Sequence, residues 1–230
     1  AIETEVIIPA CLDLMEMSCS RRLSYTELSA VAETVTDEGF HTLVSSELCR
    51  LTCSFRGLDF RLPAFDLAQR LTEHKLTLER RHFSLVRLAY ATVSEVFISD
   101  YLSQLSGNHQ IQPLFRSAVA LHKSDELCHK RLFPMLIHAV IDDWNEDHRK
   151  LFVASTFEAM AAFASRETRV WSDVLGQIYR YREECTGQIA PTCIETRGVA
   201  DFSGVSDLLM DLKLMDKWHR EMPADVFFQQ

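Results

Sequence analysis

The sequence predicts an all-α fold, a bundle of long helices that forms a single domain over residues 1–230. Glycine and proline are sparse, with seven and six copies in 230 residues, so few tight turns are expected. Leucine, alanine, glutamate and arginine are abundant, and all four favour helix. Apolar residues recur with helical periodicity along most of the chain, and no segment keeps the alternation that would build a sheet.

The first half of the chain is expected to form three helical stretches. The first covers about residues 1–18. The second covers about residues 24–52, because it opens on Ser-Tyr-Thr-Glu, which has the form of a capping box. Residues 55–65 form a connection, with a short hairpin as one option. Helix then resumes over about residues 64–105, with room for one break.

The second half is expected to be helical with one long interruption. Pro113 suits the first turn of the next helix. Pro134 should kink or restart that helix, because proline donates no amide hydrogen bond. Further helix is expected over about residues 146–184 and 205–220, whereas residues 187–204 form the longest irregular segment.

The composition excludes several classes of function. A net charge of −9 and a pI near 5.5 disfavour nucleic-acid binding, which needs clustered lysine and arginine. No run of about 18 uncharged apolar residues predicts a membrane span, and no signal peptide is evident. The seven cysteines fit no zinc-ribbon or redox-pair spacing, so buried free thiols in a reducing cytoplasm are expected. Because the opening residues already look helical, the natural N-terminus is expected to lie upstream.

One motif carries three potential metal ligands at helical spacing. It reads His-Lys-Ser-Asp-Glu-Leu-Cys-His, with His122, Glu126 and His129 as the ligand types. At about 100° per residue, these three side chains fall within about 60° of one another around a helix. They are therefore expected to converge on one point.

The core of this motif, Asp-Glu-x-x-His, occurs a second time at Asp37, Glu38 and His41. Two copies on separate helices indicate a shared metal centre. Glu79 and His82 also form Glu-x-x-His, but helical phase and neighbouring basic residues place that pair on a solvated surface.

Two further carboxylates are candidates for the same centre. Glu95 lies in a strongly apolar stretch, where an unpaired carboxylate would be costly. It should be protonated, metal-bound, or paired with Ser99 or an arginine. On the first helix, Glu3 shares its face with apolar residues, whereas Glu5 shares a mixed, wet face, so Glu3 is favoured over Glu5 as the inward carboxylate.

Bundles with such ligands build dinuclear carboxylate sites. Four carboxylates balance two divalent ions, whereas a single zinc would leave surplus buried negative charge. Mixed glutamate and histidine ligands favour iron, with manganese possible. Asp37 and Asp125 each precede a motif glutamate, and each is expected to accept the free ring N–H of the histidine on the opposite helix.

These motifs resemble those of the ferritin-like diiron N-oxygenases of the p-aminobenzoate N-oxygenase family. That family uses a first-helix glutamate, a Glu-x-x-His, a lone glutamate, and then His-x-x-x-Glu-x-x-His. The resemblance covers about residues 1–140. His122 is its specific part, because related ferritin-like diiron folds usually contribute only two histidines. The matching residues are Glu3, Glu38, His41, Glu95, His122, Glu126 and His129.

The resemblance implies a homodimeric, ferritin-like bundle with additional C-terminal helices, whose two iron ions activate dioxygen. It implies oxidation of a small-molecule amine to hydroxylamine and onward to nitroso or nitro, in secondary metabolism. Electrons would come from an external reductase or other donor, since no flavin or nicotinamide motif is present. Phe40, Thr92 and Ser99 could line the substrate cavity, with core packing as the alternative role for each.

Three other functions remain open at this level. Other diiron oxidases, such as desaturases and ribonucleotide reductase small subunits, share the fold, but His122 argues against them. A ferroxidase without an organic substrate is disfavoured by the extra C-terminal helices. A metal-free interaction module would leave four inward carboxylates unexplained.

Overall fold

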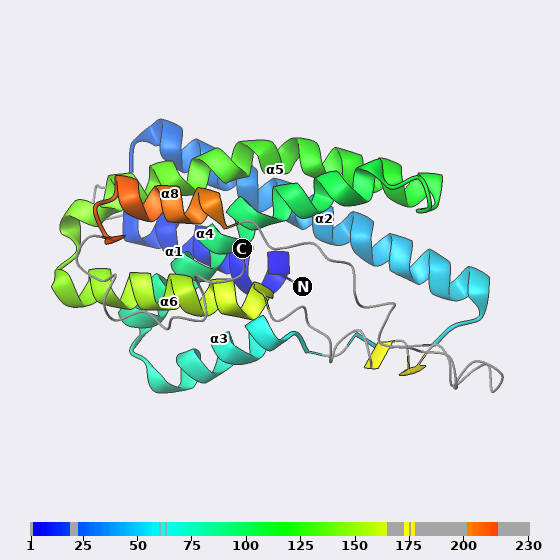
Figure 1. Ribbon diagram of the computed structural model, residues 1–230, viewed down its shortest axis with the longest axis horizontal. Coiled ribbons are helices and arrows are strands. Elements are labelled where there is room, and N and C mark those ends of the chain that lie inside the picture. The colour runs from blue at the N-terminus through cyan, green and yellow to red at the C-terminus, as the bar shows by residue number, and fades with distance from the viewer. Residues whose placement is uncertain are drawn as a thin grey trace.

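The computed structural model describes residues 2–18, 23–59, 61–62, 64–164, 173–174, 176–177 and 202–215. Within these ranges every regular element is helical, so the all-α prediction is confirmed. Figure 1 shows long helices packed side by side around α4. None of the helices in the described ranges is long and apolar enough to cross a membrane.

The helices follow the order expected from the sequence. The chain opens with a short π-helical turn, which continues directly into the first α-helix. The elements are η1 (Glu3–Ile7), α1 (Ile8–Ser18), α2 (Tyr25–Arg56), α3 (Asp66–Thr77), α4 (Arg80–Gly107), α5 (Pro113–Val140), η2 (Ile141–Asp143), α6 (Glu146–Ala164) and α8 (Ser203–Asp211).

Helix α4 forms the centre of the bundle and contacts η1, α1, α3, α5, α6 and α8. Its middle is apolar on every side, as expected for a helix surrounded by others. Eight residues between 85 and 93 are buried: Leu85, Val86, Leu88, Ala89, Tyr90, Ala91, Thr92 and Val93. Glu95 follows this run and is also buried, so the fold places a carboxylate deep inside the bundle.

Several expected boundaries are confirmed or corrected. The capping box at the start of α2 is present, because the Glu27 N–H donates to the Ser24 hydroxyl and the Ser24 N–H donates to the Glu27 carboxylate. The allowed break before α4 falls between Thr77 and Arg80. Of the kink or restart expected at Pro134, the restart is wrong, because α5 continues through this residue to Val140.

The rest of the expected C-terminal structure is described in part. Helix α6 ends at Ala164 within the described residues. Most of the expected helix beyond that residue, most of the irregular segment 187–204 and the end of the last helix lie outside the described residues. What the structure does describe there is α8, which packs on α4.

Gly204 makes that packing of α8 on α4 close. A Cβ built on Gly204 would lie 2.9 Å from Cγ1 of Val96, whereas a Cβ on Gly39 of α2 meets nothing within 4 Å. We expect Gly204→Ala to destabilise the protein by about 1–3 kcal/mol through overpacking. As its matched control, Gly39→Ala should stabilise by roughly 0.5–1 kcal/mol, because alanine favours a helix interior. Urea denaturation midpoints would measure both changes, and equal midpoints would contradict the packing argument.

Candidate metal centre

Three helices hold the buried ligand candidates. Glu38 and His41 project from α2, Glu95 from α4, and Glu126 and His129 from α5, and each is at most 3% exposed. Carboxylates and imidazoles are rarely buried to this extent without a partner or a metal. The core around them is apolar, so the polar groups form an isolated cluster inside the bundle.

Four of these side chains form a carboxylate cluster, defined as Glu38, Glu95, Glu126 and His129. One ligand atom from each lies within 4.8 Å of those of the other three. Nδ1 of His129 lies 2.9 Å from Oε1 of Glu38, 3.4 Å from Oε2 of Glu126 and 3.6 Å from Oε2 of Glu95. A single ring nitrogen therefore faces three carboxylates at once.

A second group adjoins it, the histidine cluster, defined as His41, His122 and Glu126. Nε2 of His122 lies 2.8 Å from Oε1 of Glu126, and Nδ1 of His41 lies 3.5 Å from the same oxygen. The two imidazole rings are 3.9 Å apart between centroids. Glu126 belongs to both clusters, since Oε1 faces the histidine cluster and Oε2 faces His129.

The polar atoms at the centre fit a pair of bound cations. Oε1 of Glu38, Oε2 of Glu95, Oε2 of Glu126 and Nδ1 of both His41 and His129 are buried without a hydrogen-bond partner. Each such orphan costs about 1–3 kcal/mol when it stays unsatisfied. These atoms face one another, and cations between them would satisfy all five. The nitrogen and oxygen donor set, which includes no thiolate, suits iron or manganese.

The outer nitrogens of the two buried imidazoles are held by aspartates in a crossed arrangement. Nε2 of His41 donates to Oδ2 of Asp125 at 3.1 Å, and Nε2 of His129 donates to Oδ2 of Asp37 at 3.4 Å. Each aspartate thus serves the motif on the other helix, and the pairing shows that α2 and α5 run antiparallel here. With Nε2 donating outward, Nδ1 of each ring is left as the inward donor atom.

Removal of either aspartate should weaken metal binding without removing a ligand. We expect Asp125→Ala and Asp37→Ala each to reduce metal affinity about 10–100-fold, because the ring loses the acceptor that fixes its tautomer and orientation. Calorimetric titration with ferrous iron under anaerobic conditions measures the change. Glu47→Ala is the matched control, since Glu47 is an exposed acid on α2 that pairs only with Arg50 among the contacts described. Unchanged affinity in both aspartate variants would contradict the orienting role.

Burial and crowding shift the pKa values of the central groups. Burial raises the pKa of Glu95 well above its usual range, and the charges of Glu126 and Glu38 raise it further. For Glu126 burial also raises the pKa, but the hydrogen bond with His122 and the nearby His129 ring lower it more. Burial lowers the pKa of His129, yet the neighbouring carboxylates of Glu126 and Glu38 outweigh it and raise that pKa to about 10. These carboxylates therefore need a positive charge among them.

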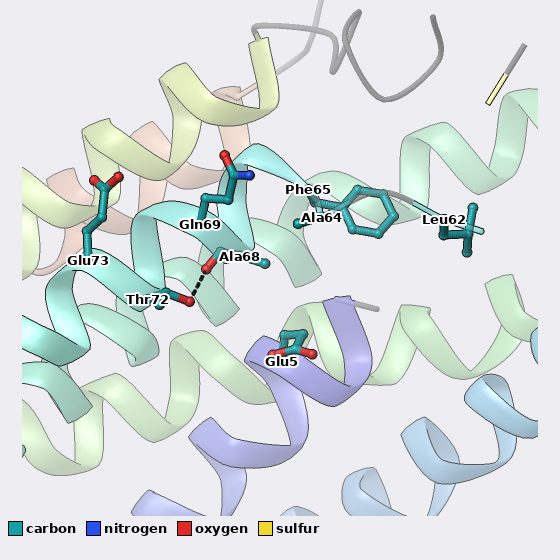
Figure 2. Close-up of a pocket in the computed structure, with 8 residues that line it drawn as sticks. All are labelled: Glu5, Leu62, Ala64, Phe65, Ala68, Gln69, Thr72 and Glu73. Atoms are coloured by element: carbon teal, nitrogen blue, oxygen red, sulfur yellow. Dashed lines mark hydrogen bonds between the residues drawn. The ribbon is translucent and has the colours of Figure 1, made fainter. Parts of the chain in front are cut away.

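The two first-helix candidates, Glu3 and Glu5, differ in their exposure. Glu3 is half-buried on η1, but it is not among the side chains whose ligand atoms meet in the two clusters. Glu5 is exposed and points into a different, open pocket between η1 and α3, lined also by Phe65 and Thr72 (Figure 2). Glu3 is therefore the more enclosed of the two first-helix candidates, and its role as a metal ligand stays a prediction.

The three residues predicted to line a substrate cavity, with core packing as the alternative, lie in different surroundings. Phe40 is 56% exposed, so neither a buried cavity wall nor core packing describes it. Thr92 is buried, and its hydroxyl donates to the carbonyl oxygen of Leu88, which fits core packing. The side chain of Ser99 lies outside the described residues. His82 of the Glu79–His82 pair, which the sequence places on a solvated surface, is half-buried and packs edge-on against His148, so it is not fully solvated.

One neighbour of the centre was not anticipated. Cys11 on α1 is fully buried, and burial together with the charge of Glu38 raises the pKa of its thiol to about 12. It follows Glu3 by eight residues, about two helical turns, which is the signal that would have found it. The four described cysteines are free, but Cys49 and Cys128 are exposed, so the expectation that the thiols are buried is wrong for these two.

Comparison with known proteins agrees with this geometry. The family model of p-aminobenzoate N-oxygenase AurF matches residues 1–212. A 4-aminobenzoate N-oxygenase from Streptomyces thioluteus is 26% identical over 198 residues, which are 84% of this chain and 59% of that protein. The chain thus spans less than two thirds of this relative. The fold of the family is ferritin-like, which confirms the predicted fold class. The chain belongs to the p-aminobenzoate N-oxygenase (AurF) family.

Proposed function

We propose that the chain binds two divalent metal ions, with iron preferred to manganese, and uses dioxygen to oxidise the nitrogen of an amine. The observation that carries this proposal is the pair of buried clusters that share Glu126, with His122 as a third histidine. Membership of the AurF family supports the same activity. Residues 1–230 would act as one ferritin-like domain within this protein.

The residues of the chain have defined tasks in this proposal. Iron, when bound, would supply the reduction of dioxygen and the transfer of oxygen to nitrogen. Glu38, Glu95 and Glu126, with Glu3, would neutralise the charge of two divalent ions. The crossed aspartates keep Nδ1 of each buried histidine turned inward. The surrounding apolar core excludes water, which strengthens every electrostatic interaction at the centre.

Further partners follow from the same proposal. The relative from Streptomyces thioluteus is named for 4-aminobenzoate, so an arylamine is the first substrate class to test. Oxidation would pass from amine to hydroxylamine and onward to nitroso or nitro. The electrons would come from an external reductase or other donor, and the protein would act as a homodimer.

The decisive experiment supplies all reactants to the natural full-length protein. Anaerobic loading with ferrous iron is followed by 4-aminobenzoate, dioxygen and a chemical reductant, with hydrogen peroxide as a second oxidant. Mass spectrometry should detect N-oxidised products, and Glu126→Ala should form none. Oxidation of iron without oxidised amine, across a panel of aryl and alkyl amines, would overturn the proposal in favour of a ferroxidase.

A further inference from the structure

The two halves of the candidate centre differ in ligand type and burial. The carboxylate cluster offers three carboxylates and one imidazole, and all four side chains are at most 3% exposed. The histidine cluster offers two imidazoles and the shared Glu126, and His122 is 17% exposed. Glu3, the predicted first-helix ligand, is also only half-buried. The two positions are therefore chemically unequal.

Charge favours the carboxylate cluster for the first ion. Three carboxylates repel one another most strongly where no water screens them, and a divalent cation among them removes that repulsion. The ligands of this cluster also lie in the middle of α2, α4 and α5, so the chain needs little further ordering to bind an ion there. The charge of Glu126 helps to attract the first ion. A second ion in the histidine cluster then meets a Glu126 carboxylate whose charge is already partly neutralised. Occupation of the first position thus weakens attraction to the second.

Ligand type separates the metals as well. Carboxylate oxygens suit manganese, so manganese can compete with iron there, whereas imidazole nitrogens suit iron. The histidine cluster, with His41 and His122 side by side at 3.9 Å between centroids, is the more selective of the two.

We propose that metal ions bind this centre in order, first at the carboxylate cluster and then at the histidine cluster, and that manganese competes with iron only at the first. This inference rests on the proposed dinuclear centre but not on the oxidation of an amine. It assigns distinct tasks to the two groups: Glu95 and His129 capture the first ion, and His122 selects the second.

Stepwise addition of Mn²⁺ to metal-stripped protein tests the order, with electron paramagnetic resonance as the readout. The first equivalent should give the six-line spectrum of an isolated ion. A second ion should bind at least about tenfold more weakly and give an exchange-coupled spectrum. One equivalent of ferrous iron added to singly loaded protein should bind at the vacant histidine cluster, whereas excess iron should displace manganese from the carboxylate cluster.

Three variants locate the steps. His122→Ala and the milder His122→Gln should keep the first step and lose the second. Glu95→Ala should weaken the first step by about tenfold or more, because one of three carboxylates is gone. Glu33→Ala, an exposed acid on α2, is the matched control and should change neither step. Circular dichroism verifies that each variant is folded, and Glu95→Gln replaces Glu95→Ala if the alanine variant does not fold.

The outcomes distinguish this inference from the proposed function. Uptake of both ions in a single step, or loss of the first step in both His122 variants, would overturn the order even if the iron-loaded protein oxidises an amine. Ordered binding without amine oxidation would overturn the function and leave the order standing. Binding of no metal at all would overturn both.

Discussion

Replacement of Glu126 by alanine is expected to lower the metal content of the protein from about two ions per chain to nearly none. Glu126 is the only side chain common to both clusters. Its Oε1 lies 2.8 Å from Nε2 of His122, and its Oε2 lies 3.4 Å from Nδ1 of His129. Without it the histidine cluster keeps two imidazoles, and the carboxylate cluster loses one of three charges.

Elemental analysis after loading and gel filtration measures this loss. Glu126→Gln keeps the shape of the side chain but removes the charge, so it should also lose most of the metal. Glu33→Ala should keep the full content, because Glu33 is exposed on α2. Retention of a full ion pair by Glu126→Ala would contradict the shared role of this carboxylate.

Removal of the metal should lower the melting temperature strongly. A metal present at a thousandfold above its dissociation constant stabilises the folded state by about 4 kcal/mol. For a domain of this size, 1 kcal/mol corresponds to about 2–4 °C in Tm. Chelation should therefore lower the Tm by roughly 8–16 °C for one site alone. The stripped protein would retain three buried carboxylates in one cluster, which is the physical origin of the loss.

The difference in Tm between loaded and stripped protein should widen from pH 6 to pH 9. Burial and neighbouring charges raise the pKa of Glu95, and the neighbouring carboxylates raise that of His129 to about 10 against the effect of its burial. Both groups hold protons more tightly when folded, so their contribution to the stability of the stripped protein falls as the pH rises. The lowered pKa of Glu126 changes the stability only at pH values below 6, which lie outside this range. Metal binding needs deprotonated ligands and strengthens in the same direction.

Differential scanning fluorimetry with and without a chelator measures both effects. Glu126→Ala provides the control, because a variant that binds no metal should melt at one temperature in either condition. A difference that narrows with rising pH, or that persists in Glu126→Ala, would refute the link between these ligands and stability.

The pattern of the sequence predicts which side chains of α2 and α5 meet, because long helices convert spacing into direction. Asp37 and Asp125 could be placed opposite the histidines of the other motif since both motifs have the same helical phase. The same rule explains the error at Phe40. Two residues after Glu38 the helix has turned by about 200°, so Phe40 faces away from the ligands and is exposed.

Other features depend on packing, which spacing does not reveal. The restart expected at Pro134 does not occur, because Leu136, Ile137 and Val140 beyond it are buried and hold the rest of α5 in the core. The burial of Cys11 beside Glu38 likewise arises from the contact between α1 and α2. Local sequence carries no measure of such contacts.

The buried ligands all lie within the interiors of uninterrupted helices rather than on loops. Glu38, Glu95 and Glu126 are each more than ten residues from either end of their helix. No hinge or flap can lift such a ligand away, so we expect an ion in the carboxylate cluster to leave when a helix segment opens and its backbone hydrogen bonds break. The lifetime of a bound ion should therefore follow the opening rate of the bundle. Exchange with isotopically labelled iron should be slow, and it should accelerate with temperature as steeply as unfolding does.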